Sequence, residues 1–203
     1  VMTATPIPRT LALTIYGDLD VTILDELPPG RRPPATSLHA GARGRKEALA
    51  RLRAERAAGR QAFVICPRVE DRAAPAARGL GPRLGRGPMR PSEEAEDGEQ
   101  EVAAAVSTAA ELRRDLPRAR VGLVHGRLPA SAREAAMTRF RAGEDHVLVA
   151  TTVVEVGVDI PAVTLMLILG ADRFGLSQLH QLRGRIGRGG GESACLLLCD
   201  PGA

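Results

Sequence analysis

The sequence lacks any long apolar run. No stretch of its 203 residues approaches the roughly 20 consecutive apolar residues that a membrane-spanning helix needs. Its first residues also lack the basic-then-apolar order of a secretion signal. We therefore expect a protein with no membrane partner and a cytoplasmic setting.

Cysteine is scarce, and its spacing is uninformative. Cys66, Cys195 and Cys199 each lie in an apolar, strand-like run, and their separation matches neither a metal site nor a disulfide framework. We expect three reduced thiols buried in the core and no metal site.

Lysine is almost absent, although the chain is basic. The formal charge is +4 and the isoelectric point is near 9.6, which suits a polyanionic partner. Nearly all the cations are arginines, with Lys46 the single lysine, so part of this excess reflects a compositional bias. The 44% hydrophobic content is ample for a core, in one large domain or in one domain plus a piece of another.

Short runs rich in Val, Ile and Leu alternate with amphipathic helical patterns. The runs predict strands at 61–66, 121–125, 146–150, 163–169 and 194–199. Helices are predicted at 46–58, 101–116 and 131–142, the last opened by a capping box of Ser131 and Glu134 and closed by Gly143. This alternation predicts an α/β fold with a doubly wound parallel sheet.

Two segments depart from the alternation. The breaker-rich ELPPGRRPP ends a distinct N-terminal part, so we expect residues 1–34 to be the end of a preceding domain and 35–203 to be a second one. Residues 69–100 are rich in Arg, Gly and Pro and then in acids, which predicts a disordered insertion. Its arginines could contact nucleic acid, but a solvated loop is the preferred interpretation.

The run HQLRGRIGRGG at 180–190 combines arginines, glutamine and glycines. With a helix capped by Ser177, one stripe is apolar and the other polar, and Gly184 and Gly187 leave the polar side open. Guanidinium groups bind phosphate bidentately, which suits a γ-phosphoryl group that gains charge in transfer. The alternative is a basic helix end. The apolar stripe is Leu179, Leu182 and Ile186, and the polar stripe is Gln178, Gln181, Arg185 and Arg188.

Polar residues follow two predicted strands. Thr151 and Thr152 stand at a strand end, where hydroxyls and amides form an anion site; the chain then turns at Gly157 and places Asp159 in the crevice beyond the strand. That carboxylate could accept from a ribose hydroxyl, whereas the alternative is a threonine cap and an aspartate turn.

His125, Gly126 and Arg127 follow another strand at the same edge, which suits phosphate contact, although a structural role for His125 is the stronger alternative. Near the N-terminus, Thr3, Ala4 and Thr5 precede a Pro-Ile-Pro turn. On the residues alone this is only a strand-to-helix junction.

Taken in order, TATPIPRT, DELPPGRRP, VGLVHGRL, VATTVVEVGVDIP and FGLSQLHQLRGRIGRG resemble the RecG family of ATP-dependent DNA helicases, within superfamily two. The resemblance spans nearly the whole chain except 69–100. It implies a motor of two RecA-like lobes that hydrolyses ATP with Mg²⁺ and remodels branched double-stranded DNA, with a single-stranded-DNA-binding protein as a possible partner. This chain would be the end of lobe one plus lobe two.

The resemblance also implies residue roles. Arg185 and Arg188 match arginine fingers, with Gly157, Asp159 and Gln181 facing the nucleotide. His125, Gly126, Arg127, Thr151 and Thr152 match contacts to the DNA backbone, and Thr3, Ala4 and Thr5 match the motif that couples nucleotide state to DNA grip.

The chain departs from the family at Leu169 and Gly170, where the family usually has an acidic residue, and in the 69–100 insertion. The 203 residues hold no GxxxxGK[ST] loop and no acidic metal-holding motif, so we expect those in a missing first lobe and expect no ATPase activity from this piece alone. The alternatives are a transcription-repair coupling translocase and a non-catalytic helicase-like DNA-binding module. A dinucleotide-binding oxidoreductase is disfavoured because no glycine fingerprint follows the first predicted strand.

Overall fold

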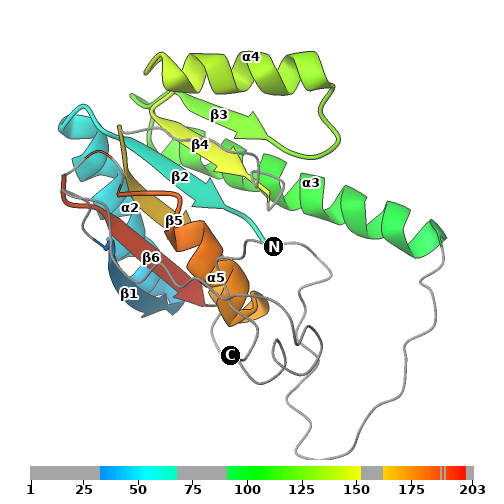
Figure 1. Cartoon of the computed structure of the whole chain (residues 1–203), viewed down its shortest axis with the longest axis horizontal. Coiled ribbons are helices and arrows are strands. Elements are labelled where there is room, and N and C mark those ends of the chain that lie inside the picture. The colour runs from blue at the N-terminus through cyan, green and yellow to red at the C-terminus, as the bar shows by residue number, and fades with distance from the viewer. Residues whose placement is uncertain (1–32, 68–90, 152–161, 188, 190, 200–203) are drawn as a thin grey trace, which may run out of the picture.

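A computed structural model describes residues 33–67, 91–151, 162–187, 189 and 191–199, with the backbone alone described over 91–98. Its strands form one sheet in the order β1-β6-β5-β2-β4-β3, with every pairing parallel (Figure 1). The predicted parallel α/β fold is confirmed. The strands are β1 (Ala35–Ala40), β2 (Gln61–Ile65), β3 (Val121–Val124), β4 (Val147–Ala150), β5 (Val163–Ile168) and β6 (Ala194–Cys199).

Helices cover both faces of the sheet (Figure 1). On β2, Ala62 and Val64 belong to one buried cluster, whereas Phe63 and Ile65 belong to the other, because successive strand residues point to opposite faces. No helix in the described residues is long and apolar enough to cross a membrane. One face packs against α2 (Gly41–Ala57) and α3 (Pro91–Asp115); the other packs against α4 (Ala130–Arg141), the 3-10 turn η2 (Ala171–Arg173) and α5 (Leu176–Arg183).

Two elements differ from the sequence prediction. Strand β1 was not predicted, because its ATSLHA sequence has no apolar run and its residues are mostly exposed. It is a strand because it pairs with β6. The helix predicted at 101–116 begins at Pro91, inside the segment expected to be disordered. Proline is tolerated at a first helical position, and the following Glu-, Gln- and Ala-rich residues are good helix formers.

The predicted helix caps were correct in only one of three cases. Gly143 closes α4 as expected, with φ of +73° and an amide that donates to the Phe140 carbonyl at 3.0 Å. The capping box of Ser131 and Glu134 is wrong, because the N-cap is Pro129 and no side chain caps the helix. The Ser177 cap is also wrong, because α5 starts after the N-cap Gly175.

The expectation for the thiols is largely confirmed. Cys66 and Cys195 are buried and Cys199 is half-buried, and the three are present as thiols. Burial raises the pKa of Cys195 to about 11, with a smaller opposing effect of Arg183.

A buried carboxylate fastens α2 to β5. Glu55 accepts a hydrogen bond from the Thr164 hydroxyl at 2.6 Å and forms ion pairs with Arg51 at 3.0 Å and Arg60 at 2.5 Å. Burial by itself would raise the pKa of Glu55, but the hydrogen bonds from Arg60 and Thr164 and the charges of both arginines outweigh it and lower that pKa. Glu55 is therefore ionised at neutral pH inside a satisfied polar cluster.

Candidate functional site

The carboxyl ends of β2, β4 and β3 lie side by side, and one candidate residue follows each strand. Cys66 comes directly after β2, Thr151 after β4 and His125 after β3. The amide of Cys66 donates to the Ala150 carbonyl at 2.8 Å, and that of Thr151 to the Val124 carbonyl at 3.3 Å. The hydrogen-bonded ladder thus continues one residue past the strands and fixes where these side chains start.

Two polar atoms at this edge are unsatisfied. Thr151 is fully buried, yet its Oγ1 has no hydrogen-bond partner among the described residues. The Nδ1 atom of His125 is in the same situation on the neighbouring strand end. A buried polar group without a partner costs about 1–3 kcal/mol. An incoming ligand with hydrogen-bonding oxygens would remove that cost, which makes this edge a candidate binding site.

A tight turn presents the cation of the site. The His125 carbonyl accepts from the Leu128 amide at 3.1 Å, and between them Gly126 and Arg127 are exposed. The Arg127 guanidinium forms an ion pair with Glu99 on α3 at 3.1 Å. Glu99 was missed as a neighbour of the site because it lies in the segment expected to be disordered. An exposed pair of this kind contributes little to stability.

The Cys66 thiol at the same edge is not a nucleophile. Its burial raises its pKa to about 11, only partly offset by a hydrogen bond with Thr108, and the nearby Glu101 and Glu111 raise it further. Since the thiolate is the reactive form, this thiol is inert at neutral pH.

The arginine motif lies on the face covered by α5. Leu179 and Leu182 pack against the core and Ile186 is buried, as the apolar stripe predicted. Gln181 is exposed on the helix, and Arg185 is half-buried, with its amide donating to the Leu182 carbonyl at 3.0 Å.

The polar stripe differs from the prediction. The helix ends at Arg183, and Gly187 takes a left-handed φ of +79°, so a continuous helix through position 188 is wrong. Gln178 is exposed on α5, and its Oε1 accepts from the Gly175 amide at 3.0 Å.

The structure therefore brings together one set of candidates, which are His125, Gly126, Arg127 and Thr151. It places Gln181 and Arg185 apart from them, on the connection between β5 and β6. Within the described residues, no group of three or more His, Cys, Asp or Glu side chains could hold a metal ion. Thr3, Ala4, Thr5, Thr152, Gly157, Asp159 and Arg188 lie outside the described residues.

Gly170 lies where the resemblance led us to expect an acidic residue. Gly170 has a left-handed φ of +56°, and a Cβ there would lie 3.1 Å from Cγ of Pro67. A side chain at this position would be strained by the backbone conformation and crowded by the proline.

The fold is that of a RecA-like lobe. Residues 98–190 match the family model described as helicase conserved C-terminal domain. The yeast Dbp5 helicase bound to RNA and ADP BeF3 superposes with a TM-score of 0.56 over 97% of this chain and 43% of that chain, at 16% identity. At that identity the likeness shows the fold alone.

Sequence similarity is more specific. The chain is 49% identical over 200 residues to the ATP-dependent DNA helicase RecG of Mycobacterium tuberculosis (strain ATCC 25618 / H37Rv), over 97% of this chain and 25% of the relative. A solved structure of RecG bound to a three-way DNA junction matches with a TM-score of 0.69 and 37% identity, over 98% of this chain and 22% of that chain. The chain is therefore similar to the RecG helicases over nearly its whole length, and it spans about a quarter of theirs.

Proposed function

We propose that this chain is the second RecA-like lobe of an ATP-dependent DNA helicase that remodels branched DNA in recombination and repair. The observation that carries the proposal is the pair of unsatisfied polar atoms, Thr151 Oγ1 and His125 Nδ1, on adjacent strand ends. Similarity to RecG over nearly the whole chain supports it, because a relative has been solved in complex with a three-way DNA junction.

The strand-end set binds the DNA backbone in this proposal. The Thr151 hydroxyl and the His125 ring hydrogen-bond to phosphate oxygens, and Arg127 neutralises a phosphate. Gly126 is exposed and has no side chain, so the DNA backbone can approach the protein backbone closely at this position. Thr152 extends this contact. Each phosphate neutralised releases counterions, which makes the affinity depend on salt but not on sequence.

The arginine motif serves ATP hydrolysis. Arg185 and Arg188 reach the γ-phosphate of ATP held by a preceding lobe, and Gln181, Gly157 and Asp159 face the nucleotide. Arg185 suits this role because it is half-buried and lies just past the end of α5. Its backbone is held there by the hydrogen bond from its amide to the Leu182 carbonyl. ATP supplies the phosphoryl group whose hydrolysis drives movement, and we place the Mg²⁺ ligands in the preceding lobe.

The remaining roles follow from this assignment. Residues 1–34 end the preceding lobe, 35–203 form the second one, and Thr3, Ala4 and Thr5 relay closure of the lobes to the DNA. The protein acts in the cytoplasm on branched double-stranded DNA, with a single-stranded-DNA-binding protein as a further partner. The chain alone has no ATPase activity.

The DNA role is tested by fluorescence anisotropy of the chain with a labelled three-way junction at rising salt. The logarithm of affinity should fall linearly with the logarithm of salt concentration. Arg127→Ala should make this line less steep, by about 1 in the magnitude of the slope. Arg45→Ala is the matched control, because Arg45 is paired with Glu111 on the α2–α3 side and should leave the slope unchanged. A flat response of the unaltered chain to salt would overturn the backbone contact.

A further inference from the structure

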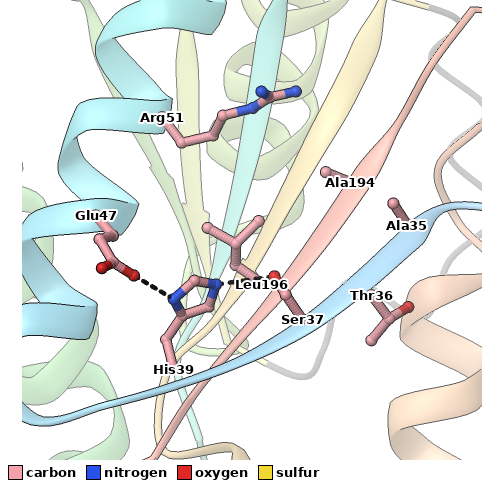
Figure 2. A pocket seen from close by; sticks show the side chains of 8 residues that line it. All are labelled: Ala35, Thr36, Ser37, His39, Glu47, Arg51, Ala194 and Leu196. Carbon is pink, nitrogen blue, oxygen red and sulfur yellow. Dashed lines mark hydrogen bonds and ion pairs between the residues drawn. The ribbon is translucent and has the colours of Figure 1, made fainter.

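A serine, a histidine and a glutamate form a linear hydrogen-bonded array on β1 and α2, at the sheet edge far from β3. The Ser37 hydroxyl lies 2.8 Å from Nε2 of His39, and Nδ1 of His39 lies 2.9 Å from Oε2 of Glu47 (Figure 2). The second oxygen of Glu47 accepts from Nε of Arg43 at 3.0 Å. A nucleophile bonded to a base that is held by a third group is the signature of an activated nucleophile.

The local sequence explains the array. Ser37 and His39 are two residues apart on a strand, so they share a face, and that face is turned toward α2. Gly44 allows the close approach of the helix, because a Cβ at this position would lie 2.8 Å from Cβ of His39. Glu47 comes one turn later on the helix and reaches the ring.

The charges fix the proton positions. The hydrogen bonds from Arg43 and then from His39 lower the pKa of Glu47, which is therefore a carboxylate at neutral pH. A carboxylate is acceptor-only, so the hydrogen-bond network assigns the Nδ1–H tautomer to His39. Nε2 is then left as the acceptor for the Ser37 O–H, which is the arrangement that general-base activation needs.

A hollow of about 370 Å³ adjoins the array, which is room for a small ligand (Figure 2). Ala35, Ala194 and Leu196 form its apolar wall, and the side chains of Ser37 and His39 line it. Since the Ala35 amide donates to the Ser193 carbonyl, the alternation of a parallel strand directs the Leu38 amide away from β6, to the edge that pairs with no other described strand. The amide after a nucleophile is a common oxyanion donor.

We propose that Ser37 is a catalytic nucleophile that accepts small acyl groups from activated carboxyl esters. The Ser37 oxygen bonds to the ester carbonyl carbon while its proton passes to Nε2 of His39. The carbon–oxygen bond to the leaving group then breaks, and the departing oxygen takes the proton from His39. Water activated by His39 later hydrolyses the acyl-serine. Glu47 is a positioning residue, and this activity is independent of the proposed helicase role.

The test uses p-nitrophenyl acetate and the full chain carrying Lys46→Arg, because the single lysine amine would also be acetylated. We expect a burst of p-nitrophenolate of one equivalent per chain and an acetyl group on Ser37 by peptide mass spectrometry. Ser37→Ala should abolish both. His39→Gln should slow the burst roughly 100-fold, the usual contribution of a general base.

Ser107→Ala is the matched control, because the Ser107 hydroxyl bonds to the Glu111 carboxylate at 3.3 Å and has no imidazole partner. It should leave the burst unchanged. Ser37→Cys gives a second test of the contact between residue 37 and His39. Iodoacetamide should alkylate the new thiol more slowly in the double variant that also carries His39→Gln than in Ser37→Cys alone. A purely structural array would lower the melting temperature of Ser37→Ala without any adduct at Ser37 in the unaltered chain. Absence of that adduct, or a burst unaffected in a folded His39→Gln variant, overturns the proposal.

Discussion

The amide of Thr151 donates to the carbonyl of Val124 across 3.3 Å, which holds the first residue after β4 against the end of β3. The amide of Thr151 is thus satisfied, while its buried hydroxyl has no partner among the described residues. A protein that only required a stable core would gain by placing valine here. In the proposed function this hydroxyl binds a DNA phosphate, so its contributions to stability and to binding can be measured separately.

Thr151→Val should separate these two properties. The substitution keeps the shape and removes the unpaired hydroxyl, so the free energy of unfolding should stay level or rise by up to about 1 kcal/mol. Affinity for a three-way DNA junction should fall roughly tenfold, the order expected for a lost hydrogen bond to a charged phosphate. Urea denaturation and fluorescence anisotropy measure the two effects.

Thr164→Val is the matched control for this substitution. The Thr164 hydroxyl donates to Glu55, so its removal should destabilise the chain by about 1–3 kcal/mol and leave DNA affinity unchanged. If both valine variants lost stability equally and bound DNA equally well, Thr151 would be a structural residue.

The carboxylate of Glu55 should make the chain sensitive to acid. Because the pKa of Glu55 in the folded chain lies below its ordinary value of 4.5, the unfolded chain takes up that proton first as the pH falls. The stabilisation is complete above about pH 4.5 and is lost as the pH falls through the folded-state pKa. Glu55→Gln should cost about 2 kcal/mol at pH 7, and this cost should shrink progressively as the pH falls below 4.5, measured by urea denaturation at each pH.

Glu111→Gln supplies the comparison. The pKa of Glu111 is also lowered, by its hydrogen bond from Arg45, but this pair lies at the surface. Its loss should change stability by less than about 1 kcal/mol at pH 7. Equal effects of the two substitutions would show that the burial of Glu55 does not matter.

The thiols should differ in reactivity. With pKa values of about 11, Cys66 and Cys195 carry roughly 100-fold less thiolate at pH 8 than thiols of the ordinary pKa of 9.0. Iodoacetamide should therefore label half-buried Cys199 first and label the other two only after unfolding in urea. Peptide mass spectrometry follows the order, and rapid labelling of Cys66 in the folded chain would contradict its inertness.

The central strands could be predicted from the sequence because each is buried on both faces, so continuous Val, Ile and Leu runs mark them. Strand β1 could not, since it lies at an edge and the pairing of Ala35 with Ala194 stabilises it instead of an apolar pattern. The two serine caps were wrong because a cap depends on where the chain enters the helix as well as on the residue type. Ser131 and Ser177 have the right chemistry, but the chain enters each helix elsewhere, through Pro129 and Gly175.

The residues of the strand-end site were visible in the sequence, but their contacts were not. His125 and Thr151 were found because polar residues directly follow apolar runs, and parallel strands bring such ends to one edge. Their lack of partners was not visible, since it depends on every neighbour in three dimensions. The ion pair of Arg127 with Glu99 was not visible either, because Glu99 is distant in sequence and lies in the 69–100 segment, whose composition indicated a loop.

The most direct test of the central claim is DNA-stimulated ATP hydrolysis by the full-length helicase that contains this lobe, with Arg185→Ala. The rate should fall roughly 1,000-fold, as for other arginine fingers, while affinity for a three-way junction stays within about twofold. Arg183→Ala is the control, because Arg183 hydrogen-bonds to His180 at 3.2 Å and should keep nearly full activity. Near wild-type turnover of the Arg185→Ala enzyme would contradict the account.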